Sequence, residues 1–406
     1  VTFTNTNVWR SGSFYDANVS AFNFNVNSKD NNYNINGKGI LSAQLDASNT
    51  LGHNLNLNIQ KQRGSLIGGL GYLEESDTYD PNDLGFNYNN NRRVFEASMA
   101  YRDFEPQWKK LMKWSVNASF SQTYLYNPSV FTSNMASLNF FTVTKKFNAF
   151  GGNGGATLQP TQDYFEPRTD GAVFTIPQFY FFNTWFSTNY QRKVAIDAGG
   201  SMNQYIGNPW KQYAYNFSPR LRLSDAIFLI YSFEKELQYN NLGYAIPFAT
   251  PAMSYQGILF GQRNRNTTIQ AIALDYIMTN RMSLSLRLRH YRSTLQYESF
   301  SLLQEDGSLN LLPDFNGLTT EGKSAYDINY NAFTIDLVYR WVFMPGSEIN
   351  IVWKNSVFAS NDAVSVAYWQ DLSSTLQTNA LNSFSFKLIY WLDAQQLSKD
   401  RSILPR

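Results

Sequence analysis

Residues 333–341 read FTIDLVYRW, and this stretch decides the fold because apolar and polar side chains alternate along it. Successive side chains of a β-strand point to opposite faces, so the stretch predicts a strand with one apolar and one polar face. A tight turn at Met344–Ser347 follows, and the alternation resumes from Glu348 to Lys354. The two stretches predict antiparallel strands joined by that turn.

The same period of two extends back through the C-terminal half. It is found in Tyr213–Arg222, Ile227–Glu234, Met282–Arg289 and Phe384–Leu392. Aromatic side chains gather at the ends of these strands, as in the interfacial girdles of membrane-spanning barrels, whereas a soluble sandwich would favour Val, Ile and Leu. Because proline cannot donate to a ladder, a bulge or kink is expected at Pro219.

The composition agrees with this class and argues against several others. The 406 residues are 16% aromatic and 16% charged, whereas soluble domains carry roughly 25% charged residues. No run of about 18 apolar residues predicts a membrane-spanning helix. The net charge of +2 argues against a nucleic-acid partner. Cysteine is absent and there are only two histidines, so no metal site, cofactor or catalytic residue is predicted.

The N-terminal half is expected to add ten strands to seven in the C-terminal half. Seventeen is odd, whereas single-chain bacterial barrels have an even number of strands, and the first strand would also descend from outside. Upstream strands missing before Val1, where neither an initiator methionine nor a signal peptide is seen, would explain both features. The ten strands are expected at Val1–Trp9, Asn18–Asn27, Asn34–Asp46, His53–Tyr72, Val94–Phe104, Leu111–Tyr126, Phe131–Lys145, Phe150–Pro160, Phe174–Thr188 and Lys193–Met202.

The predicted fold is therefore all-β: a transmembrane, antiparallel, up-and-down β-barrel with about 16–18 strands in this chain, as part of a larger barrel. It is expected to occupy residues 1–393, and residues 394–406 are expected to form a periplasmic tail. Because barrels keep periplasmic turns short and extracellular loops long, the connections orient it. The short turns are Leu223–Asp225, Met278–Arg281 and Pro345–Ser347, and the long links are Tyr239–Arg265, Ser299–Ala325 and Ser360–Thr378.

The C-terminal half also resembles a Bacteroidota outer-membrane family of unknown function, whose members carry an N-terminal carbohydrate-binding-module-like domain and a large C-terminal barrel. No such N-terminal domain is visible in this sequence. The resemblance implies that the protein lies in the outer membrane of a Gram-negative bacterium of the Bacteroidota. The matching stretches are Tyr215–Phe233, Ile258–Thr267, Leu288–Leu309, Tyr326–Asn355 and Asn382–Asp393.

The alternation places a set of ionisable side chains on the polar face, which we expect to line the lumen. Arginine facing lipid at mid-bilayer would cost roughly 2–4 kcal/mol, so these residues must point inward. They either form a mildly basic pore lining or an ion-pair network that fills a closed lumen, and their mixed signs favour the network. The set is Arg220, Arg222, Glu234, Asp275, Arg287, Arg289, Asp336, Arg340, Glu348, Lys354 and Lys387.

Three loop residues are candidates for binding. Arg263 and Arg265 could hold anionic surface glycans through their guanidinium groups, although local capping of strand ends is the favoured interpretation. Trp369 and other loop aromatics could stack on sugar rings or pack the loops over the barrel mouth, and the sequence does not choose between these. His53 and His290 are expected to be interfacial residues.

Extracellular carboxylates occur in the clusters Glu74–Asp77, Asp163–Asp170 and Glu305–Asp306. A glycosidase needs two carboxylates about 5–9 Å apart, and charged loop tips explain the clusters equally well. The leading hypothesis is an outer-membrane barrel that serves as membrane anchor and conduit, in surface glycan handling or in a larger envelope complex. The alternatives are a barrel-anchored hydrolase using loop carboxylates, and a plugged structural subunit of a secretion or uptake machine. The expected partners are the lipid and lipopolysaccharide bilayer, a surface glycan and other outer-membrane proteins.

Overall fold

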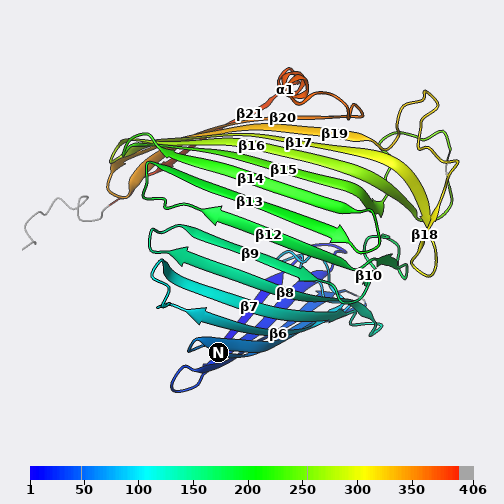
Figure 1. Cartoon of the computed structure of the whole chain (residues 1–406), viewed down its shortest axis with the longest axis horizontal. Helices are drawn as coiled ribbons and strands as arrows, with labels where there is room; N and C mark the ends of the chain where they lie inside the picture. Colours follow the sequence, from blue (N-terminus) through cyan, green and yellow to red (C-terminus); the bar gives the residue numbers. More distant parts are fainter. Residues whose placement is uncertain (47, 254, 393–406) are drawn as a thin grey trace, which may run out of the picture.

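The computed structural model describes residues 1–46, 48–253 and 255–392, and it is built almost entirely of β-strands (Figure 1). No helix in these ranges is long and apolar enough to cross a membrane. The elements are β1 (Thr2–Val8), β2 (Asp16–Asn27), β3 (Tyr33–Leu45), β4 (Thr50–Lys61), β5 (Leu66–Glu75), β6 (Arg92–Asp103), β7 (Leu111–Tyr124), β8 (Phe131–Thr144), β9 (Ala149–Ala156), β10 (Thr161–Asp163), β11 (Phe174–Ile176), β12 (Phe179–Ser187), β13 (Val194–Tyr205), β14 (Lys211–Arg222), β15 (Ile227–Tyr244), β16 (Leu259–Thr279), β17 (Met282–Leu303), β18 (Leu309–Leu311), β19 (Ile328–Met344), β20 (Ser347–Asn361), α1 (Tyr368–Leu376) and β21 (Leu381–Ile389).

The strands form one antiparallel sheet of 19 strands, in which neighbours in sequence are neighbours in space. The three-residue strand β18 is a side branch on β17, and β10 and β11 pair only with each other. The other 18 strands follow an up-and-down course from β1 to β21. Among the described residues, β1 pairs only with β2 and β21 pairs only with β20, so within these ranges the sheet is not closed into a ring. The predicted all-β, up-and-down antiparallel fold, with 16–18 strands, is confirmed.

The prediction of a single strand at His53–Tyr72 is wrong, because the structure has two strands there, β4 and β5. The chain turns between Lys61 and Leu66, where Gly64 adopts a φ of +89°, a conformation that glycine takes without strain. β4 and β5 pair across this turn. The strand number is thereby even, and β1 runs from the short-turn end of the sheet to the long-loop end. The odd count and the descending first strand were therefore errors, and they give no support to missing upstream strands.

Three smaller expectations also need correction. Phe174–Thr188 is not one strand but β11 followed by β12, and β11 lies outside the main sheet. Pro219 introduces no bulge, because the register of β14 against β15 is the same on both sides of it. Ser360–Thr378 is not a bare loop, since it contains α1. The expected tail at 394–406 lies outside the described residues.

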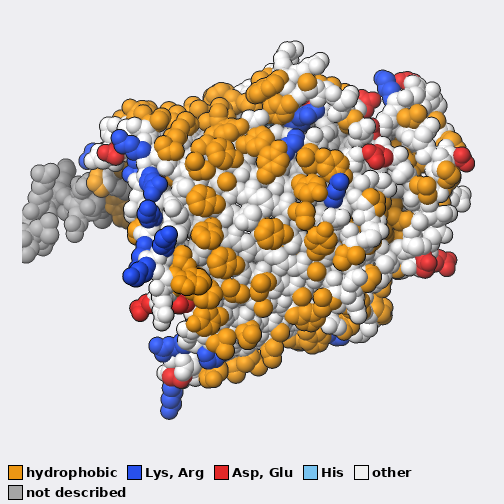
Figure 2. Space-filling view, viewed as in Figure 1, with side chains coloured by type: hydrophobic (Ala, Val, Ile, Leu, Met, Phe, Trp, Pro, Cys, Tyr) orange, Lys and Arg blue, Asp and Glu red, His pale blue; other side chains and the backbone are white. Residues whose placement is uncertain are grey.

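The two faces of the sheet differ in chemistry. Directly paired residues of an antiparallel ladder point to the same face, so the pairings assign each side chain. Leu274, Leu286, Leu337 and Trp353 form one row across β16, β17, β19 and β20 on the outer face. Figure 2 shows hydrophobic side chains spread over the strands on this convex side. The other, inner face carries the charged residues described below.

The connections alternate between a short-turn end and a long-loop end, as the sequence predicted. The links 280–281 and 345–346 are two residues long. The links 304–327 and 362–380, at the opposite end of the sheet, are among the long ones. Basic residues collect at the short-turn end, on the left of Figure 2, whereas acidic residues occur at both ends and are frequent in the long loops. Examples are Lys109, Lys110, Lys145, Lys146, Arg192 and Lys193 at the first, and Asp80, Glu166, Glu305, Asp306 and Asp314 at the second.

Candidate functional site: the inner face and its loop cap

All eleven residues predicted to line the lumen lie on the inner face. The pairings connect them in rows: Arg287 pairs with Asp336, which pairs with Lys354, so charges of alternating sign stand side by side on β17, β19 and β20. Strand pairing places the other members on the same face: Arg220, Arg222, Glu234, Asp275, Arg289, Arg340, Glu348 and Lys387.

Several of these residues form ion pairs across neighbouring strands. Arg340 Nε donates to Glu348 Oε2 at 2.8 Å, and Lys354 Nζ lies 3.7 Å from Asp336 Oδ1. Arg220 Nε donates to Asp197 Oδ2 at 2.8 Å. The partners remain partly exposed to the open side of the sheet, so each pair is worth little for stability. The inner face is therefore polar and locally neutralised rather than a ring of one sign.

A hollow of about 410 Å³ lies on the inner face between β12 and β16. Trp185 lines it, with Asn183 and Asn216 supplying amides and Glu234 and Glu236 supplying carboxylates. The Trp185 indole is 40% exposed, so its ring is accessible. An aromatic ring flanked by amides and carboxylates suits a solute rich in hydroxyl groups.

Glycines make room for this aromatic surface. A Cβ on Gly151 would lie 3.1 Å from the Trp185 indole, and a Cβ on Gly155 would overlap the Phe181 ring, 2.7 Å away. β9, which carries the GGNGG sequence 151–155, is a regular strand paired on both sides. Trp185 was not predicted from its sequence context, in which the glycine-rich stretch 151–155 and the nearby aromatic residues were the available signal.

The three candidate binding residues of the loops lie in different surroundings. Arg263 lies on β16 and is held by its neighbours: its Nη1 donates to the Tyr297 hydroxyl at 2.8 Å and to the Tyr244 carbonyl at 3.1 Å. Arg265 Nη2 donates to Glu236 Oε1 at 2.9 Å and remains 45% exposed. Trp369 lies on α1 and is 71% exposed. The structure therefore does not bring the three together.

Three long links interlock over the long-loop end. Phe174 of β11 packs against Phe260 with the rings tilted and their centroids 4.6 Å apart, and Thr175 donates its amide to the Gly307 carbonyl. Phe248 and Ala249 donate amides to the Ala325 carbonyl. Phe300 and Phe315 are buried in a cluster with Ala245, Ala325 and Tyr326. We call links 157–178, 245–258 and 304–327 the loop cap.

The loop carboxylates are engaged in local structure. Glu74 accepts from Arg93 Nε at 2.8 Å, and Glu75 accepts from Asn54 Nδ2 at 2.6 Å. Glu166 accepts from the Tyr244 amide at 2.8 Å, and Asp306 accepts from Ser308, which lowers the pKa of Asp306. Within the described ranges, no three His, Asp or Glu side chains come together as metal ligands.

His290 was expected at a lipid interface and is instead buried, with 3% exposure. It faces outward from β17, where Tyr368 of helix α1 packs against it. Its Nδ1 lies 2.6 Å from the Tyr368 hydroxyl of α1. At the next outward-facing position of β17, Arg292 Nε donates to Asp371 Oδ2 of α1 at 2.6 Å. Asn329 Nδ2 of β19 donates to the same oxygen at 2.7 Å. We call these residues the α1 patch.

Comparison with solved structures finds bacterial outer-membrane proteins. The siderophore receptor PirA of Acinetobacter baumannii is 10% identical with a TM-score of 0.46, and the match covers 95% of this chain and 72% of that one. A mutant of the ferric enterobactin receptor PfeA of Pseudomonas aeruginosa is 9% identical, with a TM-score of 0.46 and coverage of 87% and 67%. OmpT of Vibrio cholerae is 11% identical, with a TM-score of 0.33 and coverage of 83% and 94%.

No curated protein matches the chain. A family model described as a domain of unknown function, DUF5916, matches residues 1–401. The chain belongs to the DUF5916 family.

Proposed function

We propose that this chain forms the wall of an outer-membrane β-barrel that anchors its protein in the bilayer and conducts polar solutes. The segregation of the two faces carries the proposal. On β19 the outward side chains are apolar from Phe333 to Trp341, which matches the roughly 9–11 residues that a tilted strand needs to cross a bilayer.

The distribution of charge supports this placement. Within the apolar rows of β15–β20, the charged residues lie on the inner face, among them Arg287, Arg289 and Asp336. An arginine turned toward lipid at the same depth would cost roughly 2–4 kcal/mol. In this orientation the long-loop end is extracellular, and the basic short-turn end meets the phosphates of the periplasmic leaflet.

The unpaired edges of β1 and β21 require a partner in this environment. Backbone groups that lack hydrogen bonds in hydrocarbon cost several kcal/mol each, so open sheet edges do not persist there. β1 runs toward the long-loop end and β21 runs away from it. The ring is thus completed either by direct pairing of these two edges or by an even number of further strands, in the same polypeptide or in a partner protein.

We further propose that the conducted or bound solute is a glycan. The Trp185 ring, the Asn183 and Asn216 amides and the two nearby carboxylates can contact the apolar faces and the hydroxyl groups of a sugar. The resemblance to a Bacteroidota family that carries a carbohydrate-binding-like domain points to the same solute class.

Planar-bilayer conductance of the purified chain tests both proposals. We expect a steady conductance that a neutral oligosaccharide, maltohexaose, blocks reversibly. Trp185→Ala should weaken the block by roughly twofold to tenfold, the range expected for one aromatic contact, whereas Trp341→Ala on the outer face should leave it unchanged. Conductance that the oligosaccharide does not block would contradict the proposal of a glycan solute but not the proposal of a conduit.

A second candidate is a plugged structural barrel, which the loop cap favours because it spans three links at the extracellular end. Insertion into vesicles without measurable conductance would support this candidate and contradict the conduit. Failure to insert into vesicles at all would contradict the membrane placement itself.

A further inference from the structure

Above the apolar belt, the outer face of β16 and β17 turns polar over three consecutive rows. The uppermost apolar row is Ile272, Leu288 and Ile335. The next positions upward on β17 are His290, Arg292 and Thr294, which are all buried. A polar, buried zone directly above the belt lies at the depth of the lipid headgroups in the proposed orientation.

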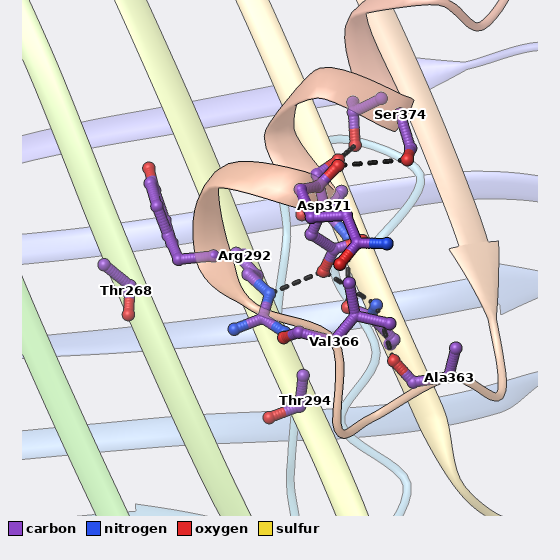
Figure 3. A network of polar contacts seen from close by, with 12 residues as sticks. Thr268, Arg292, Thr294, Ala363, Val366, Asp371 and Ser374 are labelled. Atoms are coloured by element: carbon purple, nitrogen blue, oxygen red, sulfur yellow. Dashed lines mark hydrogen bonds and ion pairs between the residues drawn. The ribbon is translucent and has the colours of Figure 1, made fainter.

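One row of this zone carries two cations. Lys235 pairs with Thr268, and Thr268 pairs with Arg292, so the two cations are two strands apart on the same face. With strands about 4.8 Å apart, their backbones are separated by about 10 Å. Figure 3 shows α1 lying over Arg292 and leaving Thr268 at the uncovered side of the helix.

The two cations have different partners. Arg292 is neutralised by Asp371 of α1 and also donates to the Val366 carbonyl at 2.7 Å. Lys235 Nζ donates only to neutral oxygens, Asn266 Oδ1 at 2.5 Å and Thr268 Oγ1 at 2.7 Å. Among the residues that the structure describes, no carboxylate forms an ion pair with it. The zone therefore carries an excess positive charge at Lys235.

A second outer-face cluster, at the long-loop end, is neutralised within the protein. There Arg93 pairs with Glu74, and His53 contacts the same carboxylate. Arg93 and His53 thus both face a carboxylate of the protein. Lys235 has no such partner among the described residues, so an anion from outside the protein would neutralise it.

Helix α1, which covers Arg292 two strands from Lys235, has apolar side chains turned away from the protein. Its polar residues Asp371 and Thr375 are buried against the sheet, whereas Trp369 and Leu376 are 71% and 51% exposed. The exposed side of α1 also carries the polar residues Gln370, Ser373 and Ser374, so it is amphipathic. An exposed tryptophan and leucine at the level of the polar zone suit the boundary between headgroups and acyl chains.

We propose that Lys235 and the exposed side of α1 form a binding site for the phosphate group of an outer-leaflet lipid. The ammonium group of Lys235 would donate to a phosphate oxygen, while Trp369 and Leu376 contact the upper part of an acyl chain. The site rests on the proposed membrane placement and adds to it a specific lipid class, one with an exposed phosphate monoester.

The test is native mass spectrometry of the full chain in phosphatidylcholine nanodiscs doped with diphosphoryl lipid A. The wild-type chain should retain lipid A, and Lys235→Gln should weaken retention about tenfold, the effect of one charge-assisted hydrogen bond. Lys235→Arg should preserve it. Lys354→Gln, the same charge change on the inner face, should have no effect.

The control arms separate the causes of failure. Inorganic phosphate alone, added to the chain in detergent, should not bind measurably, and equal binding of free phosphate would contradict a lipid site. Unchanged lipid A retention by Lys235→Gln, in a chain that inserts and conducts like wild type, would overturn this site and leave the proposed function intact. A chain that never enters nanodiscs would overturn both.

Discussion

Replacing Leu286 with arginine is the substitution whose cost follows most directly from the assignment of faces. Leu286 lies on β17 in the outer row that includes Leu274 and Leu337, and Leu337 is the central residue of the apolar run 333–341. The side chain therefore lies near the middle of the bilayer. An arginine there should destabilise the folded barrel by roughly 2–4 kcal/mol, which lowers the folding equilibrium constant about 30-fold to 1,000-fold.

The assay is equilibrium unfolding by guanidinium in phospholipid vesicles, followed by tryptophan fluorescence. Val338→Arg is the matched control, because Val338 pairs with Ser285 and Val352 on the inner face, next to water. It should cost about 1 kcal/mol or less. Leu286→Ala separates the loss of the leucine from the burial of a charge, and it should also cost much less than Leu286→Arg. Equal costs for Leu286→Arg and Val338→Arg would refute the assignment of faces.

Three further predictions concern the α1 patch and the loop cap. Asp371→Asn leaves Arg292 buried without a counterion, a change that costs about 3–5 kcal/mol, so hydrogen exchange should show residues 368–376 losing protection while β17 and β19 keep theirs. Gly261→Ala places a Cβ against the Tyr297 ring, and overpacking of about 1–3 kcal/mol should reduce exchange protection in 304–327. Burial raises the pKa of Asp327, so the protonated form stabilises the folded loop. Protection of 304–327, corrected for intrinsic exchange, should therefore be fullest below the ordinary Asp pKa and fall as pH rises through the raised value, and Asp327→Asn should abolish that dependence.

The alternating strands could be predicted from the sequence because their signal is local. Within a run such as 333–341, nine residues are enough to show which side chains face the apolar side and which face the polar side. The pairings then place Arg287, Asp336 and Lys354 in one row, as their positions in the alternation implied. The missed turn at 62–65 shows the limit of this signal. Leu66, Leu70 and Tyr72 resume an apolar alternation after Leu57 and Ile59 but out of phase with it, and this shift together with the polar stretch around Gly64 marks the turn.

The α1 patch could not be predicted, because its contacts join residues far apart in the chain. Arg292 and Asp371 are separated by 79 positions, and neither belongs to a motif. α1 itself has no side-chain hydrogen bond at its N-cap. Its polar buried face forms only because β17 and β19 present Arg292 and Asn329 to it. The hollow around Trp185 depends in the same way on strands that meet only in the folded sheet.

Site-directed spin labelling of β19 in phospholipid vesicles tests the central claim most directly. Nitroxides placed singly at each residue from Phe333 to Trp341 would be compared for collision with oxygen, which concentrates in hydrocarbon, and with a water-soluble nickel complex. We predict that oxygen accessibility peaks at residues 333, 335, 337, 339 and 341 and that nickel accessibility peaks at the residues between them. High nickel accessibility at both sets of positions, or low accessibility to both reagents at the odd-numbered ones, would show that this face does not contact lipid.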